Sequence, residues 1–541
     1  MPGMVGGPRT LVAALVVATV LSGCSAAQEP AAPPLGTLVT VEQGDLLGAE
    51  DGSVLRFRGI PYAAAPVGEL RWQPPQPPPR WTGARPAISP GARCPQLAVP
   101  PDTPHATAAS GIEDCLTLDV TVPVGTTAAS RLPVLVWIHG GGFAAGAGSD
   151  VDGRRLAEAG PLIVVTLNYR LGIFGFFGLP GLDGSGAFGL MDQQAALRWV
   201  HRNIAAFGGD PERVTLSGES AGADSVCSQM ASPAAVGLFH QVIMQSGGCS
   251  TANIVDVIRP GTGPAGDTWK PLPLVESAGQ AAAATFGCPD PATALACLRA
   301  LPAAQLVGGA GFYWSPATST STLPRRPSEV AVDVDMRPMP VLAGTTRDEG
   351  TLFTAMFYDR AGAPLTDTGF RTLLASAAGV HARAAGRTYR ALDRSPSRAW
   401  SDVITDRAYT CPALASYRWL AARGPVYAYE FADPTAPSPF VALPPDLAGG
   451  VTHGAEMPYL LDLVPGQPTF TPEQQALAAE LVDRWARFVR TGDPNGPDLN
   501  PWPRWTGDGL VLTITGAGSG STVTPAADVR NAHRCALWGI G

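Results

Sequence analysis

Lysine is almost missing from this sequence of 541 residues, in which Lys270 is the single example and arginine supplies nearly every positive charge. Asp267 stands three residues before Lys270, where a serine–lysine hydrolase of the S-x-x-K kind needs its serine, so that class is excluded. Charged residues amount to only 15%, against about 25% in a typical domain. There is no basic excess, since the formal net charge is −8, and this argues against a nucleic-acid partner.

Metal motifs and membrane-spanning runs are missing as well. The chain has no H-E-x-x-H and no C-x-x-C pair, so no metal site and no cofactor are expected. It has no run of eighteen apolar residues, so no transmembrane helix is expected. Gly (63) and Pro (54) are frequent but stay under the share of about 25–30% that is typical of low-complexity chains. These absences and this composition are typical of a folded globular protein with many turns.

The N-terminus is typical of an export signal. Arg9 precedes an apolar stretch over residues 11–21, which is too short to cross a bilayer. The segment Leu21-Ser22-Gly23-Cys24 resembles a bacterial lipobox, which makes Cys24 the lipid attachment site. We therefore expect a signal peptide over 1–23, a lipidated cysteine with a flexible tether over 24–37, and one catalytic domain over 38–541. The alternative is a plain secretory signal that ends in cysteine, and hence a secreted protein.

Short apolar runs alternate with helical patterns along the rest of the chain. Strands are predicted at 132–138, 162–167, 214–216, 242–244, 341–343 and 426–429, and helices at 189–206 and 472–490. Strands that alternate with helices predict an α/β fold, with a mostly parallel central sheet and helices on both faces.

Two glycine-rich segments follow predicted strands in this region. Gly218-Glu219-Ser220-Ala221-Gly222 matches G-x-S-x-G between a strand and a helix, which is the pattern of a nucleophile elbow that exposes Ser220. His139-Gly140-Gly141-Gly142-Phe143 directly follows the strand that ends at Ile138. Residues without side chains let backbone N–H groups approach a substrate oxygen, so this loop predicts an oxyanion hole.

Longer stretches make a family resemblance specific. The chain resembles the type-B carboxylesterases, the α/β-hydrolase family that includes cholinesterases and bile-salt-activated lipases. The matching segments include FRGIPYA (57–63), EDCLTLDV (113–120), NYRLG (168–172), the stretch 189–215 and RTGDPN (490–495).

The resemblance implies the remaining members of a catalytic triad. Its acid lies in a "(K/R)-D-E-G" segment, which matches Arg347–Gly350 and makes Glu349 the acid, with Asp348 as the neighbouring alternative. Its histidine lies in an "H-G-x-E" segment, which matches His453–Glu456. The order Ser220, Glu349, His453 is the α/β-hydrolase order of triad members.

Further roles are implied by the same resemblance. The N–H groups of Gly141, Gly142 and Ala221 would hold the oxyanion, and Glu219, Ser246 and Glu456 would form a buried supporting network. The disulfide pairs Cys94–Cys115, Cys288–Cys297 and Cys411–Cys535 are implied too. The pairing of Cys227 and Cys249 stays open.

The expected function is that of an exported serine carboxylesterase, lipid-anchored to the outer face of the membrane and acting on small-molecule esters. His453 would take the Ser220 proton, so activity should rise through a pH near 6.5 as histidine deprotonates. A lipase for longer acyl chains, or a silent binding protein on the same fold, is the alternative.

Two features bear on the substrate. The loop between Cys94 and Cys115 has no Phe, Tyr or Trp, which argues against a choline ester because no ring there could bind the cation. The segment Phe312-Tyr313-Trp314 departs from the family pattern, and its rings could line an acyl or alcohol pocket or pack in the core.

Overall fold

The buried run Leu132–Ile138 forms strand β9 with the bounds that the sequence predicts. It lies inside an eleven-stranded sheet in the computed structural model, which describes residues 3–4, 6–7, 33–98, 108–251, 268–333, 336–359, 364–390 and 394–540. β9 pairs in parallel with β11 (Ile163–Leu167) on one side and β12 (Gly209–Glu219) on the other. Its β-branched, apolar sequence suits a strand that is covered on both faces.

The parallel sheet extends beyond β12, and both its edges are antiparallel. The order is β20-β19-β17-β16-β13-β12-β9-β11-β8-β4-β3. The parallel strands after β12 are β13 (Gln241–Gln245), β16 (Val341–Thr346), β17 (Val426–Phe431) and β19 (Leu510–Ile514). The antiparallel edge strands are β20 (Ser521–Pro525), β8 (Thr117–Pro123), β4 (Val54–Pro61) and β3 (Ala49–Asp51). The predicted mostly parallel α/β sheet is confirmed.

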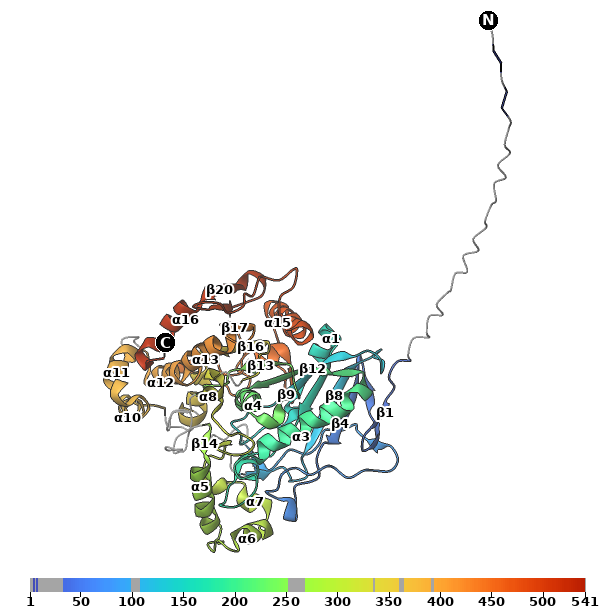
Figure 1. Cartoon of the computed structure of the whole chain (residues 1–541). Helices are drawn as coiled ribbons and strands as arrows, with labels where there is room; N and C mark the ends of the chain where they lie inside the picture. The colour runs from blue at the N-terminus through green and yellow to red at the C-terminus, as the bar shows by residue number, and fades with distance from the viewer. Residues whose placement is uncertain are drawn as a thin grey trace. The chain divides into compact units, whose positions relative to one another are not determined.

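Two hydrophobic layers cover the two faces of this sheet. Leu135 and Trp137 of β9 point into one layer, with α1 (Arg154–Ala159) and α15 (Pro472–Thr491). Val134, Val136 and Ile138 point into the other, with α3 (Phe188–Asn203) and α4 (Ala221–Met230). Figure 1 shows α1 and α15 beside each other and α3 across the sheet. The alternation of side chains along a strand produces this division.

The ends of the two predicted helices follow local signals. α3 runs into a 3-10 turn (Ile204–Phe207) that stops at Gly208, which has a left-handed φ of 80°. α15 begins at a capping box in which Thr471 and Gln474 exchange hydrogen bonds.

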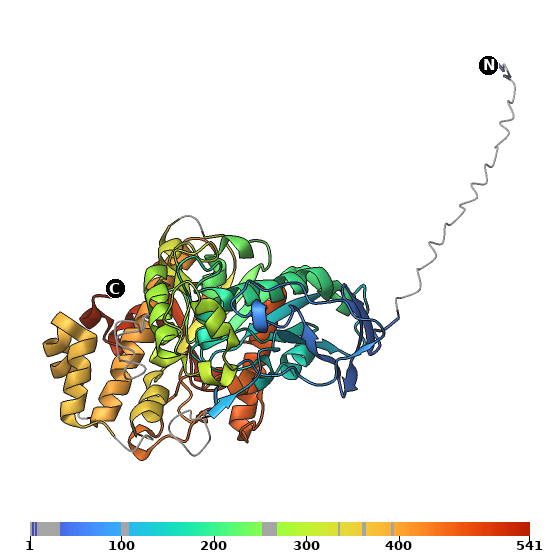
Figure 2. The ribbon, with the colours of Figure 1, turned by 90° about the horizontal axis from the view of Figure 1, so that it is seen from below.

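The remaining helices surround this frame. They are α2 (Gly172–Phe176), α5 (Leu272–Thr285), α6 (Ala294–Ala300), α7 (Ala303–Leu306), α8 (Pro327–Val332), α9 (Gly350–Thr354), α10 (Asp367–Ala378), α11 (Ala382–Arg390), α12 (Pro396–Ile404), α13 (Cys411–Ala421), α14 (Met457–Leu460) and α16 (Ala526–Ala532). A π-helical segment, η9 (Thr405–Thr410), joins α12 to α13. α10 and α11 pack against α12, and they appear as the gold and orange helices in Figure 2.

Short strand pairs lie outside the main sheet. They are β1 (Leu38–Val41) with β2 (Gly44–Leu47) and β5 (Arg85–Pro86), β6 (Gln96–Ala98) with β7 (Ala108–Ser110), β10 (Val151–Asp152) with β18 (Asp462–Leu463), and β14 (Lys270–Pro271) with β15 (Ala317–Thr318). Residues Pro34–Gly541 form one compact unit. Cys24 and nearly all of the predicted signal and tether lie outside the described residues.

Within the described residues, no single helix has the length and apolar composition to cross a bilayer, although a bent pair of helical segments over 294–300 and 303–311 meets both conditions together.

Four disulfides are present in the described residues. Cys94–Cys115, Cys288–Cys297 and Cys411–Cys535 are the pairs that the family resemblance implies. The fourth joins Cys227 to Cys249 and answers a question that the sequence leaves open. It links helix α4 to the loop that follows β13.

Candidate active site

Ser220 lies at a sharp turn between β12 and α4. Its backbone has φ 57° and ψ −126°, a conformation that residues with side chains rarely adopt. A β-carbon added at Gly222 would lie 2.1 Å from the carbonyl oxygen of Ile138, so the turn can approach β9 only with glycine at that position. The strained strand–turn–helix geometry is that of a nucleophile elbow.

The glycine loop after β9 lies against this elbow. A β-carbon added at Gly140 would come within 3.0 Å of Ser220 Cβ, so the first glycine borders the serine side chain. Gly141 and Gly142 have left-handed φ values of 97° and 61°. Among the described residues, neither of their N–H groups takes part in a hydrogen bond. Two N–H groups without a partner among the described residues are therefore present in the loop that borders Ser220, as an oxyanion hole requires.

The histidine of this loop has a structural role. Burial lowers the pKa of His139 to about 4, so the ring is neutral at ordinary pH. Its Nδ1 lies 2.9 Å from the Gly140 carbonyl oxygen, and its ring stacks on Tyr169 with a centroid separation of 4.5 Å. Tyr169 also donates a hydrogen bond to the His139 carbonyl oxygen.

Glu349 and His453 are in direct contact. Glu349 Oε2 lies 2.5 Å from His453 Nδ1, and both side chains are buried. The other carboxylate oxygen, Oε1, accepts a hydrogen bond from the backbone N–H of Thr346 at the end of β16. Two bonds thus hold the carboxylate, and it in turn orients the imidazole ring.

Asp348, the neighbouring alternative for the acid, faces other partners. It forms an ion pair with Arg398 at 2.6 Å and accepts a hydrogen bond from the backbone N–H of Val451. It also pairs with Arg347 at 3.0 Å. The hydrogen bonds of the described residues include none between Asp348 and His453.

A second carboxylate lies at the other nitrogen of the His453 ring. Glu219 Oε1 is 3.1 Å from His453 Nε2. Burial by itself lowers the pKa of His453, but the charges of Glu219 and Glu349 outweigh it and raise this pKa to about 9. Burial raises the pKa of Glu219 to about 8. These pKa values place the deprotonation of His453 above the pH of 6.5 that the sequence suggests.

Ser220 and His453 are not directly bonded in this structure. The hydrogen bonds of the described residues include none between Ser220 Oγ and the imidazole, whose Nε2 faces Glu219 instead. Catalytic contacts are often loose without substrate and tighten in the bound complex. Ser220 is therefore not hydrogen-bonded to the His453–Glu349 pair, although the residue before it, Glu219, lies next to the His453 ring.

The predicted supporting network is buried, but it is not closed by direct bonds. Glu219, Ser246 and Glu456 are each at most 5% exposed. Glu456 Oε1 accepts hydrogen bonds from Gln245 and Tyr429, and within the described residues Ser246 Oγ has no partner. Burial raises the pKa of Glu456, as does the nearby charge of Glu349. Gln245 and Tyr429 are members of this cluster that the sequence analysis missed.

Two aromatic rings that the sequence analysis did not identify flank His453. The ring centroids of Phe353 and Tyr409 lie 5.0 and 5.2 Å from that of the imidazole. Phe353 stacks on Tyr409 at 5.7 Å. Phe353 is on α9 and Tyr409 is on η9, so only the folded chain brings them to the histidine. They limit the positions that the ring can take.

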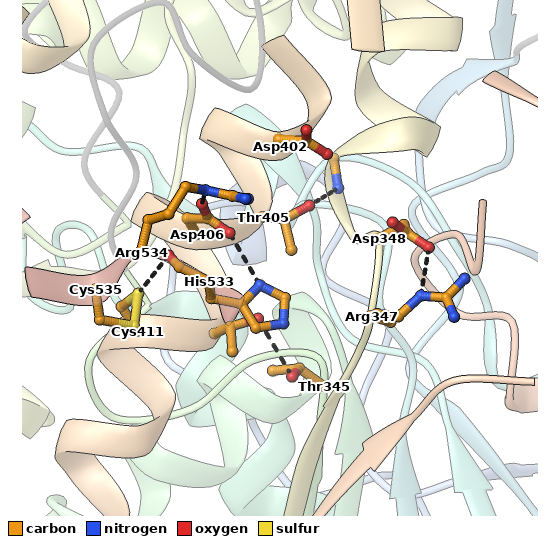
Figure 3. A network of polar contacts seen from close by, with 12 residues as sticks. Thr345, Arg347, Asp348, Asp402, Thr405, Asp406, Cys411, His533, Arg534 and Cys535 are labelled. Carbon is orange, nitrogen blue, oxygen red and sulfur yellow. Dashed lines mark hydrogen bonds and ion pairs between the residues drawn. A yellow bond between two sulfur atoms is a disulfide. The ribbon is translucent and has the colours of Figure 1, made fainter. Parts of the chain in front are cut away.

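The π-helical segment η9 joins this region to the C-terminus. Thr405 accepts a hydrogen bond from the backbone N–H of Gly350, the residue after Glu349. Asp406 binds His533 Nδ1 at 2.9 Å and Arg534 Nε at 2.7 Å. Figure 3 shows His533 directed at Asp406, close to the Cys411–Cys535 disulfide. The C-terminal residues thus hold a segment that contacts the His453 ring and the residue that follows Glu349.

The three aromatic residues over 312–314 have separate roles. Trp314 is buried, packs on Phe177 and Phe312, and donates its indole N–H to Gly309. Tyr313 is half-buried, and its hydroxyl would lie 3.6 Å from a β-carbon added at Gly142. Trp314 is therefore a packing residue, whereas Tyr313 lies beside the glycine loop.

The fold agrees with comparisons to known proteins. The family model described as "Carboxylesterase family" matches residues 36–538. The para-nitrobenzyl esterase of Bacillus subtilis (strain 168) is 33% identical over 487 residues, which cover 88% of this chain and 94% of that protein. The cocaine esterase of Homo sapiens is 32% identical over 536 residues, with 93% and 89% covered.

A solved structure shows the same fold. The Geobacillus stearothermophilus carboxylesterase EST55 matches with a TM-score of 0.76 and 31% identity, over 93% of this chain and all of that one. The chain belongs to the carboxylesterase family and is a carboxylic-ester hydrolase of the α/β-hydrolase fold.

Proposed function

We propose that this enzyme hydrolyses esters with Ser220 as nucleophile, His453 as general base and Glu349 as the acid that orients it. The 2.5 Å contact between Glu349 and His453, beside a strained elbow that carries Ser220, is the observation on which the assignment rests. A serine hydroxyl is a weak nucleophile at neutral pH and needs a base within reach. The buried carboxylate stabilises the imidazolium that forms when the base takes the proton.

The reaction then has two halves. Ser220 Oγ attacks the ester carbonyl carbon, its proton passes to His453 and then to the leaving alcohol, and an acyl-enzyme forms. Water attacks the acyl carbon with the same base and releases the acid. In both halves the negative oxygen would be held by the N–H groups of Gly141, Gly142 and Ala221. Each such donor lowers a barrier by about 2.7–4 kcal/mol.

This route requires a small rearrangement at His453. Its Nε2 faces Glu219, and it must reach Ser220 Oγ when substrate is bound. The rings of Phe353 and Tyr409 allow the imidazole to turn only within a narrow space, so the change is a local one. We assign Glu219, Ser246 and Glu456 to the support of this histidine, because all three are buried, Glu219 lies 3.1 Å from the ring and the charge of Glu456 also acts on it.

The proposed substrate is an ester whose alcohol part carries no quaternary cation. The loop from Cys94 to Cys115 provides no ring for a quaternary cation. Relatives are named a pyrethroid hydrolase in Rattus norvegicus and a cocaine esterase in Homo sapiens, and these names support an ester as the substrate.

Removal of the nucleophile is the direct test. Ser220→Ala should lower kcat for 4-nitrophenyl acetate by a factor on the order of 10⁶, as expected when a nucleophilic serine is lost. A fluorophosphonate should label the wild type at Ser220 and leave the variant unlabelled. Turnover that persists in folded Ser220→Ala would overturn the assignment. Comparison of monomeric esters with an emulsified triglyceride separates an esterase from a lipase.

We also propose that the chain is exported and lipid-anchored through Cys24. The sequence Leu21-Ser22-Gly23-Cys24 supports this proposal. The mature protein should begin with a lipid-modified Cys24 by mass spectrometry and fractionate with membranes. The variant Cys24→Ser should move to the soluble fraction. A wild type that is soluble with an unmodified N-terminus would contradict the proposal.

A further inference from the structure

The single lysine of the chain lies in the protein interior. Lys270 is 0% exposed and lies on β14, which pairs in parallel with β15. Its backbone N–H donates to the Pro316 carbonyl oxygen, and its own carbonyl oxygen accepts from Thr318 Oγ1 at 3.4 Å. The backbone of Lys270 is thus hydrogen-bonded to residues that directly follow the aromatic residues 312–314.

The amine of Lys270 contacts the same segment. Nζ donates to Ser315 Oγ at 2.5 Å. It also lies 4.7 Å from the ring centroid of Tyr313 and 5.7 Å from that of Phe312. An ammonium over a ring face is attracted by the negative π surface. One hydroxyl and two rings from residues 312–315 are therefore among the neighbours of this nitrogen.

A buried cation is costly, so its partners must be well placed. Removing an ammonium from water costs several kcal/mol unless hydrogen bonds and other favourable contacts replace the water. The other basic residues of this chain are arginines, whose planar guanidinium carries five donors. The compact ammonium of Lys270 carries three donors, and one of them is used by Ser315 Oγ. The contacts thus favour one position of the Tyr313 ring.

The Tyr313 ring borders the proposed oxyanion hole. Its hydroxyl would lie 3.6 Å from a β-carbon added at Gly142. An ester carbonyl held by the Gly142 N–H has its acyl chain attached one bond away. The acyl chain must therefore start close to Tyr313, and the position of that ring decides how much room the chain has.

We propose that Lys270 is a positioning residue that holds the Tyr313 ring beside Gly142 and so limits the size of the acyl group that the enzyme accepts. The inference rests on the proposed function, in which Gly142 helps to hold the oxyanion. Lys270 touches no reacting atom, and its effect is on selectivity rather than on the chemical step.

The test is a series of 4-nitrophenyl esters from acetate to decanoate. In Lys270→Met, which replaces the amine by an unbranched apolar side chain one atom shorter, kcat/KM for decanoate relative to acetate should rise by about fivefold or more, which is within the range of pairwise couplings between contacting residues. Tyr313→Ala should change the ratio in the same direction. The double variant should add little to the larger single effect, because both changes act through one ring.

A matched control lies on the same strand pair. Thr318→Val removes a hydrogen bond to the Lys270 carbonyl oxygen but no contact with the rings, so its ratio should equal that of the wild type. If Lys270→Met does not fold, Ser315→Ala is tested in its place, because it removes the hydroxyl that accepts a hydrogen bond from Nζ and keeps the lysine. An unchanged ratio in the folded Lys270→Met or Ser315→Ala protein overturns the inference.

A spectroscopic measurement tests the contact itself. Since the chain has one lysine, protein labelled with ¹³Cε-lysine has a single Cε–H resonance. The Tyr313 ring current should displace this resonance, and Tyr313→Ala should move it towards its random-coil position. A resonance that does not move contradicts the placement. Loss of activity in Ser220→Ala tests the catalytic assignment separately, so the two ideas can fail independently.

Discussion

The two nitrogens of the His453 ring face different carboxylates, and Nε2 lies 3.1 Å from Oε1 of Glu219. Nδ1 is held by Glu349 at 2.5 Å. A base that takes a proton from Ser220 must use Nε2, because Nδ1 is occupied. Glu219 therefore competes with Ser220 for the histidine, and its charge controls when the imidazole becomes neutral.

The pH dependence of activity should show this influence. A nearby negative charge favours the imidazolium, so the pKa of His453 is raised to about 9 and the neutral base appears only at higher pH. The acidic limb of kcat/KM should lie above pH 6.5. Glu219→Gln removes one charge and should move the limb to lower pH. Because Glu219 and His453 titrate as a coupled pair, the midpoint of the acidic limb is not assigned to either residue alone. The midpoints of the wild type and of Glu219→Gln are compared instead.

An acidic limb near pH 6.5 in both proteins would contradict this prediction. The control is Glu158→Gln on α1, because that carboxylate is far in sequence from the site and bonds to Ser53. Its profile should match that of the wild type.

Substitutions of Glu349 and of its neighbour Asp348 should have different effects. Glu349→Gln removes the charge that orients His453 and should lower kcat by about 10⁴, the loss seen when a triad carboxylate becomes an amide. Asp348→Asn leaves Arg398 without its 2.6 Å partner, so it should lower the melting temperature more than the activity. Thermal melts and kcat of both proteins distinguish the two. The reverse pattern would make Asp348 the catalytic acid.

The disulfide between Cys227 and Cys249 should stabilise the fold. The two cysteines are 22 positions apart, and closing a loop of that length in the unfolded chain is worth about 3 kcal/mol in the chain-entropy model. The double variant Cys227→Ala/Cys249→Ala should lose about that free energy of unfolding in a urea titration. Peptide mapping of unreduced wild type provides the control, and two free thiols at these positions would refute the link.

The His533 cluster should make stability depend on pH. Burial alone lowers the pKa of His533, but hydrogen bonds to Asp406 and Glu430 raise it to about 10, above its value of about 6.5 in an unfolded chain. The cluster therefore stabilises the protein fully below pH 6.5, and this contribution is lost as the pH rises towards 10.

His533→Gln tests this sign. It leaves Glu430 without its charged partner, so the unfolding free energy should fall by about 3 kcal/mol or more near pH 6. The difference between wild type and variant should narrow steadily towards pH 10. His201→Gln, which changes an exposed histidine, should produce no such trend. A difference that grows with pH would show that His533 is not held as an imidazolium.

Local sequence patterns were sufficient to predict strands and helices of the central α/β sheet. The run Leu132–Ile138 is β9 without a change of bounds, and the helix predicted at 472–490 is α15 with one added residue. Such segments are decided by apolar periodicity and by caps that lie within a few residues. The antiparallel edge strands and the π-helical turn η9 carry no comparable local signal, because distant partners stabilise them.

By itself the sequence determined the elbow around Ser220, the glycine loop after β9 and, through family resemblance, the segments that hold Glu349 and His453. These are short motifs whose backbone demands are met by the residues within them. Only the tertiary structure decided which carboxylate faces which nitrogen of His453, and that Phe353 and Tyr409 enclose its ring. It also placed the one lysine beneath Tyr313. Those contacts join residues that are far apart along the chain, and their energies exist only after burial has removed the water between them.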